Sequence, residues 1–70
     1  MQISTGLAAL TRREREVLTE LARGRSYSAM ATALFVSENT VKTHVTSVYR
    51  KLGVERRIDA LRVARERELI

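Results

Sequence analysis

The segment from residue 37 to residue 53 constrains the fold of this chain more than any other. Spacings of four, three and four residues place its apolar side chains on one side of an α-helix, and these are Val41, Val45, Val48 and Leu52. Read as a strand, the segment would present only three apolar or aromatic residues among the five on that face. Ser37 is a favourable N-cap and Gly53 a favourable stop, and the roughly four turns between them exceed a typical strand. A helix over 38–52 is therefore predicted, although it is rich in β-branched residues.

The opposite side of this predicted helix carries hydrogen-bond donors and no acidic residue after Glu38. We call this side the donor face. Its residues are Asn39, Lys42, Thr43, Thr46 and Arg50, with His44, Ser47 and Lys51 on the flanks. In the DNA major groove, lysine reads guanine, asparagine reads adenine, and the threonine methyl group contacts that of thymine. A helix face that is merely solvated more often alternates Glu with Lys at a spacing of four. The pattern therefore favours contact with double-stranded DNA.

The first predicted helix is delimited by two local signals. Thr11 and Glu14 have the spacing of a capping box, in which each side chain bonds the backbone N–H of the other residue. Gly24 suits the left-handed position that follows a helix. These signals predict a helix over about 12–22.

A helix-turn-helix unit is predicted over about 26–52. Ser26 is a suitable cap for a helix over 27–34, and the next helix begins after a short apolar turn that contains Phe35 and Val36. Two helices joined in this way cross at a steep angle. Such a turn usually contains glycine, and this one does not.

We expect an all-α fold with one domain at 10–70, preceded by a short lead or linker end at 1–9. The four predicted helices span about residues 12–22, 27–34, 38–52 and 58–68. The candidate core residues are Leu10, Val17, Leu18, Leu21, Met30, Ala31, Leu34, Val36, Val41, Val45, Val48, Leu52, Val54, Leu61 and Ala64.

Composition excludes several classes of function. The chain has no cysteine, one histidine and one aspartate, which leaves few groups from which to build an active site. We expect no enzyme activity, no cofactor and no metal, and we interpret His44 as a packing or phosphate-contacting residue. No apolar run approaches the ~20 residues of a membrane span, and the start does not resemble a signal peptide, so a cytoplasmic location is expected. Of the net charge of +5, residues 38–57 carry +3, which favours a polyanionic partner.

Three stretches of the sequence resemble the LuxR-type (GerE-like) DNA-binding domain of bacterial transcription regulators. They are LTRREREVL at 10–18, ALFVSENTVKTHV at 33–45 and YRKLGV at 49–54, and the resemblance covers about residues 8–65. It implies a domain of four helices in which the second and third form the helix-turn-helix. It also implies that the third helix lies in the major groove and that the fourth pairs two domains on an inverted repeat.

The resemblance also implies roles for individual residues. The positions that read bases are Lys42, Thr43 and Thr46, and those that contact phosphates are Ser37, Thr40, Arg50 and Lys51. The positions of dimer contact are Ile58, Leu61 and Arg62. The chain would then be the output domain of a regulator that also carries either a receiver domain or an ATP-binding regulatory domain.

Some positions depart from the family pattern. Tyr27 and Ala29 replace an asparagine and a glutamate, so local packing near the second helix should differ. Arg56 replaces the small polar cap of the fourth helix, which should begin without a side-chain cap. Arg62 and Arg65 would repel their counterparts in a second copy, so weak self-association is expected.

A second hypothesis is a helical protein-docking module that binds an acidic partner, such as RNA polymerase or a regulatory domain. Helix-turn-helix folds do serve that purpose, and the fold alone does not decide the function. The donor face, which no glutamate interrupts, argues against it. Attachment to an anionic membrane is not expected, because no helix pairs a large apolar face with a free lysine stripe.

Overall fold

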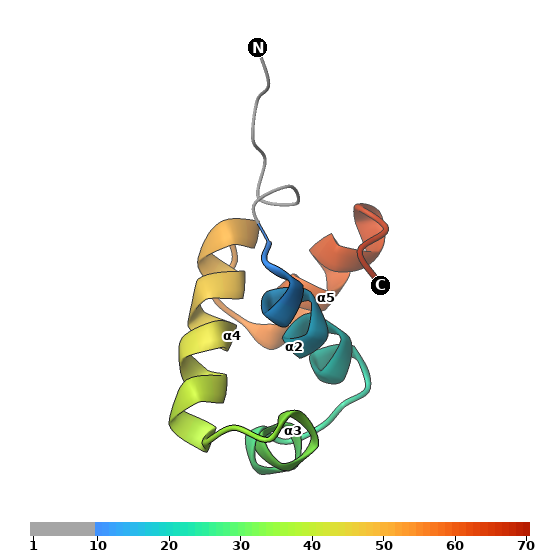
Figure 1. Ribbon diagram of the computed structural model, residues 1–70. Coiled ribbons are helices and arrows are strands. Elements are labelled where there is room, and N and C mark those ends of the chain that lie inside the picture. The colour runs from blue at the N-terminus through green and yellow to red at the C-terminus, as the bar shows by residue number, and fades with distance from the viewer. Residues whose placement is uncertain (1–9) are drawn as a thin grey trace.

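The computed structural model describes residues 10–70, which form four helices and no strand. The helices are α2 (Arg12–Ala22), α3 (Tyr27–Leu34), α4 (Glu38–Leu52) and α5 (Arg57–Glu66) (Figure 1). The all-α prediction and the bounds predicted for the first three helices are confirmed. The predicted lead at 1–9 lies outside the described residues.

Side-chain caps explain why α2, α3 and α4 begin where they do. The backbone N–H of Thr11 donates to Glu14 Oε1 at 2.9 Å, and the N–H of Glu14 donates to Thr11 Oγ1 at 3.0 Å, which completes the capping box. Ser26 Oγ accepts a hydrogen bond from the backbone N–H of Ala29, and Ser37 Oγ accepts one from that of Thr40, both at 3.1 Å. Each cap contributes about 1 kcal/mol to helix stability.

The turn between α3 and α4 uses Phe35 where glycine is usual. Phe35 adopts the left-handed conformation, with a φ of 59°. The N–H of Val36 donates to the carbonyl of Ala31 at 3.0 Å, and the N–H of Phe35 donates to the carbonyl of Thr32 at 3.3 Å. This pair of bonds is a Schellman motif, which ends α3 and redirects the chain. In Figure 1, α3 is seen almost end-on while α4 runs across the view, as the steep crossing of a helix-turn-helix requires.

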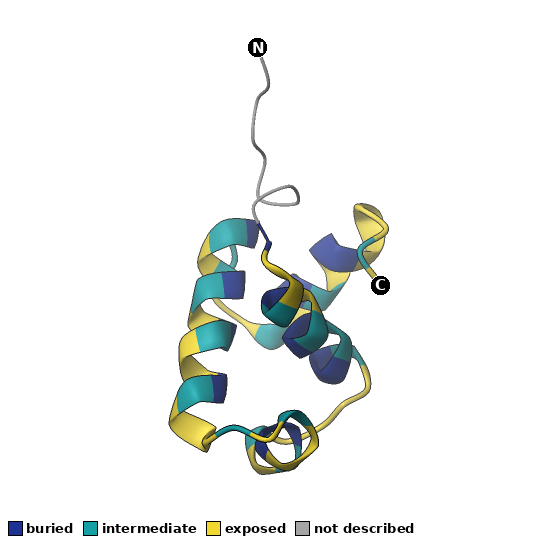
Figure 2. Ribbon diagram, in the orientation of Figure 1, coloured by how far each residue is buried: buried dark blue, intermediate teal, exposed yellow. Residues whose placement is uncertain are grey.

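Helix α4 packs against α2, α3 and α5. Its buried side faces these helices, and its outer side is largely exposed (Figure 2). The buried hydrophobic residues form one core cluster: Leu10, Val17, Leu18, Leu21, Met30, Ala31, Val41, Val45, Val48, Leu52, Ala60, Val63 and Ala64. This arrangement leaves the donor face of α4 on the surface.

The core prediction needs correction at its edges. Leu34, Val36, Val54 and Leu61 are only partly buried, although they pack against the core. Ala60 and Val63 are buried and were not predicted. The inner face of α5 consists of Ala60, Val63 and Ala64. Successive residues of a helix are about 100° apart around its axis, so Leu61 lies at the edge of this face.

Helix α5 also ends earlier than the predicted residue 68. Glu68 is left-handed, with a φ of 59°. The N–H of Glu68 donates to the carbonyl of Arg65 at 3.1 Å, and the N–H of Leu69 donates to that of Ala64 at 2.8 Å. This second Schellman motif lets Leu69 pack against the core. At its other end, α5 begins at Arg57, one residue before the predicted start, and Arg56 makes no side-chain cap bond, as expected.

Candidate nucleic-acid interface

The donor face, which is the outward face of α4, contains a shallow groove lined by residues of this helix alone. Lys42, Thr43, Thr46, Ser47 and Arg50 line it. Lys42 and Thr46 are exposed, and neither has a hydrogen-bond or ion-pair partner among residues 10–70. Their polar atoms are therefore available to a ligand that lies along the helix.

Thr43 differs from Thr46 in what it can offer. Its hydroxyl donates to the backbone carbonyl of Asn39 at 3.1 Å, within α4. The proton of this hydroxyl is thus committed to the helix itself, whereas the methyl group remains for an apolar contact such as the thymine methyl group.

Ser37 and Thr40 lie together at the N-terminus of α4. Ser37 Oγ accepts the N–H of Thr40 at 3.1 Å and donates to Thr40 Oγ1 at 3.0 Å. The free N–H groups and the helix dipole make this end of the helix favourable for an anion. Glu38, in the same turn, is exposed and negatively charged, so it offsets part of the positive potential at this end of the helix.

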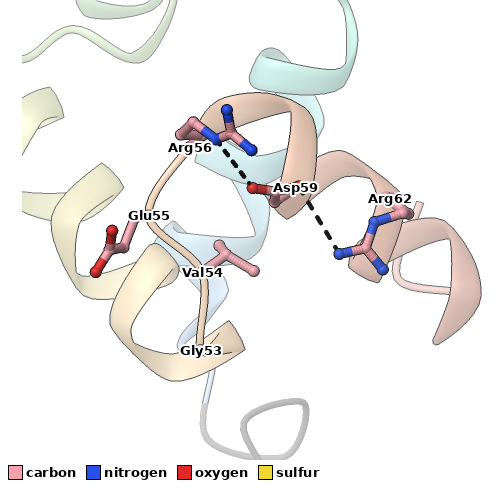
Figure 3. A pocket seen from close by; sticks show the side chains of 6 residues that line it. All are labelled: Gly53, Val54, Glu55, Arg56, Asp59 and Arg62. Atoms are coloured by element: carbon pink, nitrogen blue, oxygen red, sulfur yellow. Dashed lines mark hydrogen bonds and ion pairs between the residues drawn. The ribbon is translucent and has the colours of Figure 1, made fainter.

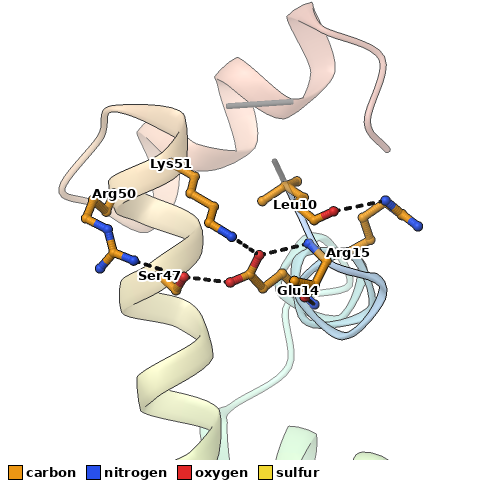
Figure 4. A network of polar contacts seen from close by, with 7 residues as sticks. Leu10, Glu14, Arg15, Ser47, Arg50 and Lys51 are labelled. Atoms are coloured by element: carbon orange, nitrogen blue, oxygen red, sulfur yellow. Dashed lines mark hydrogen bonds and ion pairs between the residues drawn. The ribbon is translucent and has the colours of Figure 1, made fainter. Parts of the chain in front are cut away.

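Lys51 is expected at a phosphate, and the structure places its ammonium against a buried carboxylate. Lys51 Nζ donates to Glu14 Oε1 at 2.7 Å, and Glu14 is only 5% exposed (Figure 4). The Ser47 hydroxyl donates to the other oxygen, Oε2, at 2.6 Å. These contacts join α2 to α4 across more than 30 residues of sequence.

The environment of Glu14 keeps it ionised. Burial alone would raise the pKa of Glu14, but hydrogen bonds from Lys51, Ser47 and the backbone of Thr11, together with the Lys51 charge, outweigh burial and lower the pKa from 4.5 to about 2. The capping box was predictable from the sequence. The contacts with Ser47 and Lys51 were not, because no local spacing relates them to Glu14.

The residues expected at a dimer contact lie on α5, apart from the donor face. Ile58 is 71% exposed, and Leu61 is partly buried. Arg62 forms ion pairs with Asp59 at 3.8 Å and Glu66 at 3.3 Å. A pocket beside them is lined by Gly53, Val54, Glu55, Arg56, Asp59 and Arg62, and it carries charges of both signs (Figure 3). Asp59 therefore neutralises part of the positive charge at this end of the domain.

Comparison with known proteins identifies the family of this scaffold. The model of bacterial regulatory proteins of the luxR family matches residues 8–64, which include all of α2, α3 and α4. The chain belongs to the luxR family. The LuxR-type resemblance seen in the sequence is thereby confirmed.

Individual relatives of this LuxR-family chain are transcriptional regulators. The uncharacterized transcriptional regulatory protein YhcZ of Bacillus subtilis is 57% identical over 51 residues, which are 73% of this chain and 24% of the relative. The probable transcriptional regulatory protein NarL of Mycobacterium tuberculosis is 48% identical over 61 residues, 87% of this chain and 28% of the relative. The chain thus spans about a quarter of the length of these curated relatives.

A solved structure shares the fold. The response regulator ChrA of a heme-sensing two-component system superposes with a TM-score of 0.85 at 48% sequence identity, over 89% of this chain and 31% of that chain.

Within residues 10–70 of the LuxR-family chain, no helix has both the length and the hydrophobicity to cross a bilayer.

Proposed function

We propose that this chain binds double-stranded DNA sequence-specifically, as the output domain of a bacterial transcription regulator, with α4 in the major groove. The observation that carries the proposal is the outward face of α4. Lys42 and Thr46 have no partner there among the described residues, and no acidic residue follows Glu38 on the helix. A helix that presents donors in this way on a helix-turn-helix scaffold suits the width of the major groove.

In this proposal, three residues read base edges. Lys42 donates to guanine, since its ammonium has three N–H donors and no acceptor. Thr43 contributes its methyl group, because its hydroxyl already bonds Asn39. Thr46 contributes both a hydroxyl and a methyl group. A half-site that combines guanine and thymine is the expected target.

Four residues hold the phosphate backbone. Ser37 and Thr40 act at the N-terminus of α4, and Arg50 and Lys51 act near its C-terminus. Lys51 already binds Glu14, so its role combines a structural ion pair with a positive charge beside the DNA. Only cationic side chains neutralise phosphates, so the two hydroxyl contacts add nothing to the salt dependence. For Arg50 and Lys51, log K is expected to fall with log salt at about 0.9 per phosphate neutralised.

Two copies are proposed to bind an inverted repeat through α5, with Ile58, Leu61 and Arg62 at the contact. The exposed Ile58 side chain supports this assignment. Asp59 and Glu66 offset the charge of Arg62, which reduces the repulsion expected between two copies. In the cell we place the regulator in the cytoplasm, with RNA polymerase as a second proposed partner.

Selection from a random duplex library at moderate salt tests the proposed function. The expected result is an enriched half-site, occurring singly or as an inverted repeat. Retention of DNA without enrichment would contradict sequence-specific binding. No retention at low salt would favour the alternative, a module that docks on an acidic protein.

A further inference from the structure

A chain of hydrogen bonds runs from the buried Glu14 to the exposed Arg50 through a single hydroxyl (Figure 4). Ser47 Oγ donates to Glu14 Oε2 at 2.6 Å, and Arg50 Nη2 donates to Ser47 Oγ at 3.3 Å. A serine hydroxyl has one proton and two lone pairs. Because the proton goes to the carboxylate, the lone pairs of Ser47 are directed to other donors, and the guanidinium of Arg50 uses one of them.

The inner end of this chain is held firmly. Glu14 is 5% exposed and accepts bonds from the Thr11 backbone at 2.9 Å and from Lys51 Nζ at 2.7 Å. Its carboxylate is therefore a fixed, charged acceptor, and a bond from a hydroxyl to a charged acceptor is short and strong. Ser47 is consequently held in one rotamer by a residue of a different helix.

The outer end of the chain retains its capacity to bind an anion. Arginine has five N–H donors, and the bond to Ser47 occupies one of them. Within residues 10–70, no carboxylate forms an ion pair with Arg50, so its positive charge is not neutralised. Arg50 also lines the groove that contains Lys42 and Thr46. Its free N–H groups are thus positioned at the edge of the surface assigned to DNA.

We infer that Ser47 is a positioning residue, which uses Glu14 as an anchor to hold the Arg50 guanidinium ready for a DNA phosphate. The inference rests on the proposed function. A free arginine side chain loses rotamer entropy when it binds, and a guanidinium that is already oriented loses less. Ser47 thus increases affinity without contacting the DNA.

A double-mutant cycle tests this role, with the full 70-residue chain and the duplex enriched by selection. The variants are Ser47→Ala, Arg50→Gln and the double variant. Arg50→Gln is expected to weaken binding about tenfold and to lower the salt slope by about 0.9, the loss of one phosphate contact. Ser47→Ala is expected to weaken binding about two- to fivefold in the wild-type background and to have no effect in the Arg50→Gln background.

Matched variants separate positioning from stability. Ser47→Thr keeps the hydroxyl and should bind as the wild type does, whereas Ser47→Cys replaces the oxygen with a weaker acceptor and should resemble Ser47→Ala. Circular dichroism establishes that each variant is folded, and if Ser47→Ala does not fold, Ser47→Cys takes its place in the cycle. Equal weakening by the serine substitution in both backgrounds would overturn the inference.

Failure of the proposed function and failure of the positioning role of Ser47 give different results. If the wild-type chain enriches no duplex, the proposed function fails before the cycle begins. If the wild type selects a site and the cycle shows no coupling between Ser47 and Arg50, only the positioning role fails. Arg67→Gln serves as the charge control, because Arg67 is exposed at the C-terminal end of α5, outside the donor face of α4, and should change affinity little.

Discussion

The carboxylate of Glu14 completes the cap of α2 and also fixes two residues of α4. Its contacts with Ser47 and Lys51 bring together residues that are 33 and 37 positions away. Removing either partner would leave a buried charge with fewer bonds, which is more costly than removing an exposed ion pair. Glu14 therefore links the stability of the domain to the placement of its donor face.

This coupling predicts an acid-sensitive component of stability. The pKa of Glu14 is about 2 in the folded chain, against 4.5 for the ordinary value. A lowered pKa contributes stability that is fully present above about pH 4.5 and lost as the pH falls towards 2. The contribution is about 3 kcal/mol.

Urea unfolding between pH 2 and pH 7 measures this component. Glu14→Gln should lower the free energy of unfolding at pH 7 and should reduce its dependence on pH in the acid range. The other carboxylates titrate in both proteins, so the difference between the two profiles isolates Glu14. Parallel profiles would show that Glu14 contributes no pH-dependent stability.

Phe35 provides a second test of local energetics. A bulky residue in the left-handed conformation costs about 1 kcal/mol or more, and the Phe35 side chain is 94% exposed, so burial returns little. Phe35→Gly should raise the free energy of unfolding by about 0.5 kcal/mol, after the greater unfolded-state entropy of glycine is subtracted. Gly53→Ala is the opposite control and should lower it by about 1 kcal/mol, because Gly53 has a φ of 74°. A loss of stability in Phe35→Gly would show that the left-handed conformation of Phe35 does not destabilise the fold.

The start of a helix was predictable from the sequence where a neighbouring side chain caps it. Ser26 and Ser37 cap α3 and α4 through residues three positions away, so the sequence contains the whole signal. The end of α5 depends on Leu69 reaching the core, which no local pattern announces. The donor face of α4 followed from helical spacing, whereas the link from Ser47 to Glu14 depended on how α2 and α4 pack.

Helix α5 is open to stabilisation at its first residue. Arg56 occupies the N-cap position in an extended conformation and makes no cap bond. Arg56→Ser should supply an acceptor for a backbone N–H of the first turn. The free energy of unfolding should then rise by about 1 kcal/mol, and the thermal midpoint should rise with it. Arg56→Ala removes the exposed pair with Asp59 without adding a cap, and should change stability little. Equal midpoints for the two variants would contradict the expected cap.

The four helices place two different surfaces on one small domain. The donor face belongs to α4, and the exposed Ile58 belongs to α5, with the apolar core between them. If α5 pairs two copies on an inverted repeat, Ile58→Asp should weaken binding to a duplex with two half-sites and leave binding to one half-site unchanged. Titration of both duplexes checks this. Equal weakening on both would assign Ile58 to folding or to direct DNA contact.

Discrimination between duplexes by the wild type and by Lys42→Ala tests whether the outward face of α4 reads DNA. The affinity of each protein is measured for the selected duplex and for a scrambled duplex of the same composition, with Arg67→Ala as the charge control. We expect Lys42→Ala to lose about tenfold or more of the preference for the selected duplex, the value of one good base contact, and Arg67→Ala to keep the preference. If Lys42→Ala binds the selected duplex as tightly and as selectively as the wild type, the outward face of α4 does not read DNA.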